Sequence, residues 1–126
     1  MTRPPNRWHH LLLKNSTRPA EWLRGALTAA VLSIVSEEET YGYLVAQRLK
    51  AGGLGVVKGG TLYPLLSRLE QDGDVATSWR ASAGGPGRKC YSISPTGEQH
   101  LRTLRIDWQI FSDHATAIIS GEKLQS

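Results

Sequence analysis

Residues 59–70 combine a regular apolar stripe with polar groups that suit binding to a phosphate or a base edge. Their sequence is GGTLYPLLSRLE. Leucines recur at the spacing of one face of an amphipathic helix, at Leu62, Leu65, Leu66 and Leu69. The opposite face begins without a carboxylate and offers hydroxyls and a cation, which hydrogen-bond to phosphates and bases. The stretch therefore predicts a helix over residues 58–72 that either reads DNA or is an ordinary surface helix.

The elements around this helix have to position it. The sequence predicts helices over residues 21–36, 41–49 and 95–120, and strands over residues 75–80 and 88–93. Thr40 is the predicted N-cap of the second helix, and Ser94 with Pro95 begins the last. A glycine-rich loop, residues 81–87, joins the strands. Three helices followed by strand, loop and strand predict an α+β fold, a winged helix-turn-helix, whose third helix enters the major groove.

Eight residues are predicted to contact DNA in this arrangement. They are Lys58, Gly60, Thr61, Tyr63, Pro64, Arg68, Arg88 and Lys89. Gly59 and Gly60 would let backbone N–H groups at the helix start approach a phosphate closely, and a proline in the first turn loses little by lacking an N–H. The cations of the third helix and of the wing, Arg80 included, are expected to cluster, whereas the acidic residues 37–39 are expected to face away from DNA.

Several motifs occur in one order and spacing. They are YGY at residues 41–43, GTLYPLLSRLEQDG at 60–73 and GGPGRKCY at 84–91. Together they resemble the PadR family of transcriptional regulators, and the similarity extends over residues 23–119. One element departs from the family pattern, since Ser94-Pro95-Thr96-Gly97 stands where a Thr-x-x-Gly turn is usual. The resemblance implies a winged-helix DNA-binding regulator of the small type, with a single C-terminal helix for dimerisation.

The last helix carries a heptad of apolar residues, called here the seam. The seam residues are Leu101, Leu104, Trp108, Phe111, Ala115 and Ile118, at spacings of 3, 4, 3, 4 and 3. This regularity predicts a dimer interface, although the helix could instead cover only its own domain. The resemblance implies that an aromatic residue here lines a pocket between subunits for flat aromatic effectors, which makes Trp108 the predicted effector-binding residue; the alternative is a core tryptophan. Trp79 is interpreted as structural.

Composition and charge limit the classes of function. Residues 1–24 hold five cations and one carboxylate, which accounts for the whole net charge of +4. The one cysteine excludes an internal disulfide, and no apolar run approaches the roughly 20 residues of a membrane span. The four histidines do not have metal-ligand spacing. We therefore expect a cytoplasmic protein without enzymatic activity, cofactor, metal or membrane contact.

The sequence thus predicts three parts: a basic N-terminal arm (residues 1–20), a winged helix-turn-helix domain (21–94) and a dimerisation helix (95–120). The expected partners are double-stranded DNA, a second copy of the chain and a small aromatic effector. The expected function is that of a homodimeric, sequence-specific transcriptional regulator, a repressor at an inverted-repeat operator. The alternative from another class is a winged helix that binds a partner protein and has no DNA affinity; an enzyme is a more distant alternative.

Overall fold

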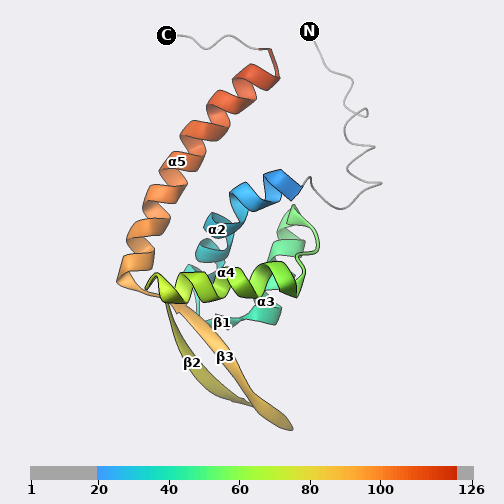
Figure 1. The fold of residues 1–126 in the computed structure, drawn as a ribbon, viewed down its shortest axis with the longest axis vertical. Coiled ribbons are helices and arrows are strands. Elements are labelled where there is room, and N and C mark those ends of the chain that lie inside the picture. The colour runs from blue at the N-terminus through green and yellow to red at the C-terminus, as the bar shows by residue number, and fades with distance from the viewer. Residues whose placement is uncertain (1–19, 122–126) are drawn as a thin grey trace.

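The computed structural model describes residues 20–121 of the 126-residue chain, with side chains from residue 25 on. The helices of this part are α2 (Ala20–Glu37), α3 (Gly42–Leu49), α4 (Gly59–Gln71) and α5 (Pro95–Ile119). The strands are β1 (Thr40–Tyr41), β2 (Val75–Ser82) and β3 (Gly85–Ile93), and β3 is the central strand of the antiparallel sheet. The predicted α+β class is confirmed. The β2–β3 hairpin and α5 leave the helical body at one end of α4 and extend in opposite directions (Figure 1).

The core lies between α2, α3 and α4. The predicted leucine stripe of α4 is buried in full, and α2 contributes Leu27, Val31, Leu32 and Val35. Val45 and Leu49 of α3 complete this packing. Ala30 and Ile34 of α2 pack against this core and are only partly buried. Because the leucine stripe of α4 faces this core, the opposite, polar side of α4 is left exposed to solvent.

The start of α3 differs from the prediction. Thr40 is not a helix cap, because it lies in β1 and pairs with Tyr91 of β3. The residue at the N-cap position is Tyr41, in an extended conformation and without a side-chain cap bond, so the helix begins at Gly42. Strand pairing extends through Tyr41, so the helix begins after it and Thr40 lies one position before the N-cap.

The connection after α3 also contains more structure than its glycines suggested. A π-helical turn, Lys50–Leu54, continues α3. Gly53 and Gly55 then have φ angles of 96° and 85°, which side chains other than glycine rarely adopt. The chain therefore reverses sharply here before it enters α4.

The two wing strands are longer than predicted. Ser82 pairs with Gly85, so the expected loop of residues 81–87 shrinks to a tight turn at Ala83 and Gly84. Gly84 has a φ of 71°, which suits this turn. A register shift between Arg80 and Ser82 marks an irregularity close to the tip. We call residues 75–93 the wing hairpin.

Ser94 and Pro95 begin α5 as predicted. The Ser94 hydroxyl accepts a hydrogen bond from the Gly97 N–H at 3.0 Å, and Pro95 follows at the first helical position. The first turns of α5 pack on the core through Leu101, and Arg105 donates to the Ser33 hydroxyl of α2 at 3.1 Å. Beyond this contact, α5 extends clear of the helical body (Figure 1).

Candidate nucleic-acid interface

The outer face of α4 is the first part of the candidate site. Lys58 is the N-cap residue, and its carbonyl accepts the Thr61 and Leu62 N–H groups at 2.9 and 3.0 Å. Gly60, Thr61 and Pro64 are all exposed, and no acidic side chain lies in the first turn. Because the first amides of an α-helix, here those of Gly59 and Gly60, have no carbonyl partner within the helix, a negatively charged group is favoured here.

Pro64 lies deeper in α4 than the sequence interpretation placed it. The helix begins at Gly59, so Pro64 lies in the second turn rather than the first. It has no N–H to donate to the carbonyl of Gly60, four residues earlier. The exposed surface of α4 therefore presents a backbone acceptor as well as hydroxyl groups.

Tyr63 has a packing role beside the predicted contact with DNA. A side chain at Gly42 would lie 2.6–2.8 Å from the hydroxyl and ring carbons of Tyr63, so the ring lies directly over the start of α3. The tyrosine is still 51% exposed. Two of the sequence motifs, residues 41–43 and 60–73, thus meet at the contact between Gly42 and Tyr63.

The cations of the wing hairpin do not form the free cluster that the sequence suggested. Lys89 is bonded to Glu70 of α4, with 2.8 Å between Nζ and Oε1. Arg80 makes an ion pair with Glu39 at 2.9 Å. Arg88 lies over the Tyr41 ring, 4.1 Å from its centroid, and among the described residues it has no carboxylate within ion-pair distance. Arg88 is therefore the wing cation best placed to meet a phosphate.

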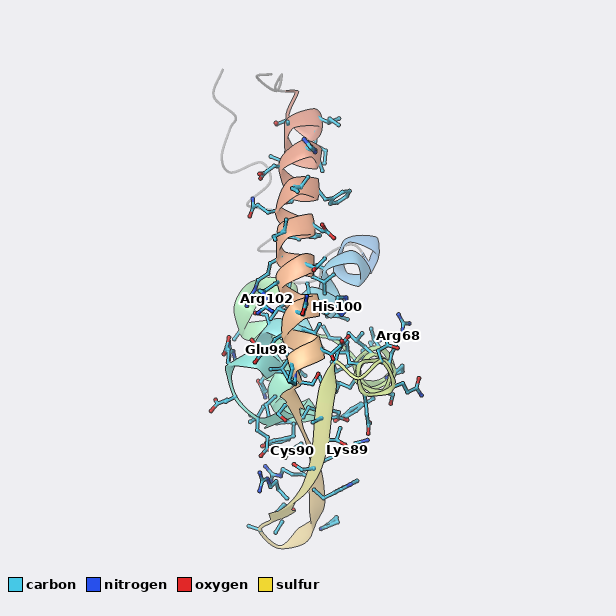
Figure 2. All side chains as sticks on the ribbon, turned by 90° about the vertical axis from the view of Figure 1, so that its left-hand side faces the viewer. Arg68, Lys89, Cys90, Glu98, His100 and Arg102 are labelled. Carbon is cyan, nitrogen blue, oxygen red and sulfur yellow. The ribbon has the colours of Figure 1, made fainter. Side chains whose placement is uncertain are left out.

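Arg68 is also separated from the wing. It lies on the side of α4 that is turned away from the hairpin, whereas Lys89 lies on the hairpin itself (Figure 2). The helical repeat explains this, because Arg68 and Glu70 are two residues apart and so point to different sides of α4. A bound duplex would therefore contact Arg68 and Lys89 at separate places.

The ion pairs of the wing shift the pKa values of their members. Hydrogen bonding from Lys89 holds the pKa of the Glu70 carboxyl below its ordinary value of 4.5, and Glu70 raises the pKa of Lys89 in turn. Arg80 lowers the pKa of Glu39 in the same way. Thr77 adds a hydrogen bond of 3.1 Å to Glu70. The contacts with Glu70 tie the wing hairpin to α4, and the pair of Arg80 with Glu39 ties it to the residue before β1.

No sequence pattern indicated these ion-pair partners. Residues 37–39 were expected to face away from DNA, yet Glu39 reaches the wing and bonds both Arg80 and Ser78. Glu37 is bound to Arg48 of α3 at 2.6 Å. Glu39 and Arg80 are 41 residues apart in the chain, and no local pattern links residues at such a separation.

The seam of α5 divides into two parts. Leu101 is buried in the core of its own domain, and Leu104 packs against that core. Trp108, Phe111 and Ile118 are 43%, 65% and 78% exposed. The three large side chains of the upper seam are therefore exposed within one copy of the chain, whereas Ala115 of the seam is partly buried. Sequence analysis missed three further exposed apolar residues on α5, which lie off the heptad: Ile106, Ile110 and Ile119.

Other kinds of site have less support in the described part of the chain. Residues 20–121 contain no group of three or more His, Cys, Asp or Glu side chains arranged to hold a metal ion. None of their helices has the length and apolar character needed to cross a membrane. Cys90 is buried in the central strand of the sheet. The predicted arm, apart from Ala20, lies outside the described residues.

Three packed helices followed by a projecting hairpin, with the polar face of the third helix exposed, define a winged helix-turn-helix protein. A sequence model described as the transcriptional regulator PadR-like family matches residues 31–103. The chain belongs to this family of transcriptional regulators, and the family predicted from its motifs is confirmed.

Individual relatives agree with this assignment. The transcriptional regulator Rv3488 of Mycobacterium tuberculosis is 30% identical over 102 residues, which span 81% of this chain and 91% of the relative. A PadR-like transcriptional regulator from Bacillus cereus is 33% identical with a TM-score of 0.72, covering 82% of this chain and all of the other. A PadR family regulator from Eggerthella lenta gives the same identity and TM-score over 79% of this chain and 86% of its own.

Proposed function

We propose that this regulator is a cytoplasmic, homodimeric repressor without enzymatic activity that binds an inverted-repeat operator in double-stranded DNA. The observation that carries the proposal is the outer face of α4, where Lys58, Gly60, Thr61 and Pro64 form an exposed surface free of carboxylates in its first turn. Hydroxyls, a cation and the first amides of the helix together match the acceptors of the phosphate backbone and the major-groove base edges.

The proposed binding mode places α4 of each subunit in successive major grooves, about 34–36 Å apart. Arg88 then contacts a phosphate from the wing hairpin, because it is exposed and no carboxylate of the described residues lies within ion-pair distance of it. Lys89 can join only by exchanging the Glu70 carboxylate for a phosphate. The two predicted wing contacts are thus unequal, and Arg88 carries more of the affinity.

The proposed dimer forms through α5. Its upper half extends clear of the domain and exposes Trp108, Phe111 and Ile118 on one side. A helix that presents a row of large apolar side chains to water is stabilised when a second helix covers them. Residues 21–94 then form the DNA-binding domain and residues 95–120 the dimerisation helix, while the basic arm of residues 1–20 adds affinity for phosphates.

The central test of the reading helix is Thr61→Ala. The change is expected to weaken binding to a duplex selected from a random pool by about 1–3 kcal/mol, because a base or phosphate partner is lost. Fluorescence anisotropy with the labelled duplex measures the loss. Thr103→Ala, the same substitution at an exposed position of α5, is the matched control and should leave affinity unchanged.

Tyr63 needs a gentler substitution than alanine, because its ring packs over Gly42. Tyr63→Phe removes the hydroxyl alone, and a loss of affinity then reports a direct contact with DNA. Wild-type affinity in both Thr61→Ala and Tyr63→Phe would exclude this side of α4 as the reader.

The second candidate function, a winged helix that binds a protein partner, is favoured by one observation. Most wing cations are already paired with carboxylates of the same chain, as in Lys89–Glu70 and Arg80–Glu39. Salt dependence separates the two functions. A DNA reader loses affinity steeply as salt rises, by about 0.9 in the logarithmic slope per phosphate contact, whereas an interaction module shows no affinity for any duplex.

We further propose that Trp108 contributes to a site for a small, flat aromatic effector between the subunits. Its ring lies 6.1 Å from that of Phe111, tilted by 44°, and it is half exposed. Asp107 precedes it and Asp113 lies on the same helix, so carboxylates near the rings would favour a cationic ligand.

A planar cationic dye tests this site. It is expected to quench the tryptophan fluorescence of the wild type, and the quenching should vanish in Trp108→Phe, because the indole that meets the dye is lost. Trp79→Phe is the control, since it removes an exposed indole from a different part of the molecule. Equal quenching in wild type and Trp108→Phe would contradict an effector site at the seam.

A further inference from the structure

Trp79 of β2 is the most exposed aromatic side chain of the described residues. It is 70% exposed, which differs from its interpretation as a structural residue. Tryptophan is a largely buried residue in most proteins, because its indole has a large apolar surface. An indole that supports no core and lies open to water calls for an occupant that covers it.

The wing hairpin holds this indole on a definite face. Trp79 pairs with Lys89 across the hairpin, and the next pair on the same face is Thr77 with Tyr91. Glu70 of α4 accepts hydrogen bonds from both Thr77 and Lys89, so this face of the hairpin lies next to α4. Trp79 therefore lies on the surface that continues outward from α4 along the wing.

Gly87 lies next to the indole of Trp79 on the neighbouring strand. A side chain at this position would approach the Arg80 carbonyl to 3.0 Å and the Cε3 atom of Trp79 to 3.7 Å. The absence of a side chain lets the indole lie close to the neighbouring strand near the wing tip. The indole therefore lies beside Gly87 of the neighbouring strand and remains exposed.

The charge of the wing hairpin indicates what kind of surface covers Trp79. Residues 75–93 contain three cations, Arg80, Arg88 and Lys89, and no carboxylate. Arg80 and Lys89 are paired with Glu39 and Glu70, so Arg88 is the hairpin cation without a carboxylate partner among the described residues. A hairpin with one such cation and an exposed indole fits a polyanion that also offers apolar surface. The sugar–phosphate backbone of DNA has this combination, because each deoxyribose presents C–H groups between two phosphates.

We propose that Trp79 packs its indole against deoxyribose of the duplex next to the groove occupied by α4, so that the wing binds DNA by apolar contact as well as by charge. This inference rests on the proposed function and adds a residue to it. It assigns Trp79 to a sugar on the face of the hairpin next to α4, and Arg88, which pairs with Arg80 on the opposite face, to a separate phosphate.

The salt dependence of binding distinguishes the two kinds of contact. Trp79→Ala is expected to weaken binding to the selected duplex by about ten- to a hundred-fold, because a large apolar contact is lost, with no change in the slope against salt. Arg88→Ala should reduce that slope by about 0.9. Trp79→Phe keeps a flat ring and should retain most of the affinity. Hydroxyl radicals attack deoxyribose, and bound protein protects the sugars that it covers. The sugars next to the wing should lose this protection in Trp79→Ala alone.

Two results would overturn the inference. One is that Trp79→Ala keeps the affinity and the sugar protection of the wild type. The other is that Trp79→Ala loses affinity and also shows a reduced salt slope, as Arg88→Ala does, because the indole would then serve only to place Lys89. Both leave the proposed function standing. A wild-type protein that enriches no duplex from the random pool would instead refute the proposed function itself.

Discussion

A chain that carries both Phe111→Asp and Ile118→Asp is expected to be a folded monomer with little affinity for an inverted-repeat operator. Both side chains are exposed within one copy, so their loss leaves the domain core intact. Two buried apolar side chains from each protomer contribute about 8 kcal/mol to a dimer, and their removal raises Kd by more than about ten-thousand-fold. Analytical ultracentrifugation measures the change in mass.

DNA binding should fall together with dimerisation. Two linked reading heads gain about 10²–10⁴ in affinity over one, and the monomer forfeits this gain. Thr116→Asp introduces a carboxylate at an exposed position of α5 outside the seam and should leave a dimer. A double variant that still sediments as a dimer, with normal helical circular dichroism, would place the interface elsewhere.

Gly97→Ala is expected to destabilise the domain and to displace α5. An added Cβ would lie 1.9 Å from the Asp74 carbonyl oxygen and 2.9 Å from Cγ1 of Ile93. Backbone cannot move aside as a flexible side chain can, so the overpacking costs about 1–3 kcal/mol or more. The same carbonyl accepts the Ser94 N–H at 3.0 Å, and a shift here would tilt the dimerisation helix against the DNA-binding domain. Urea unfolding measures the loss of stability.

Gly25→Ala is the matched control for this prediction. Gly25 lies inside α2, and an added Cβ there meets nothing within 4 Å. Alanine is the better helix former, so this variant should gain about 0.5–1 kcal/mol. Equal stability of Gly97→Ala and wild type would show that the start of α5 yields more readily than its contact with Asp74 implies.

The fold could be predicted wherever the information is local. The leucine stripe of α4 specified its buried face, and Ser94 with Pro95 specified the start of α5, because periodicity and capping act over a few residues. The error at Thr40 has the opposite origin. A threonine before a helix is a good cap in isolation, but pairing with Tyr91, far along the chain, placed it in a strand.

The candidate site was less predictable, since its contacts join distant segments. Spacing identified Lys58, Thr61 and Arg88 as exposed polar residues near α4 or in the wing, but not that Lys89 is held by Glu70. The sequence also did not reveal that the side chain of Trp79 is exposed. An aromatic residue in a strand is as consistent with a core as with a surface until the neighbouring elements are placed.

The most direct test of the account is a competition between duplexes for the wild-type protein. The preferred sequence, selected from a random pool, is compared with the same base pairs in scrambled order and with one half-site moved by five base pairs. We predict at least about a thousand-fold preference over the scrambled duplex at physiological salt. Moving the half-site should abolish most of this preference, because the two α4 helices would face opposite sides of the duplex. Equal affinity for all three duplexes would contradict the claim that this chain reads DNA as a dimer through α4.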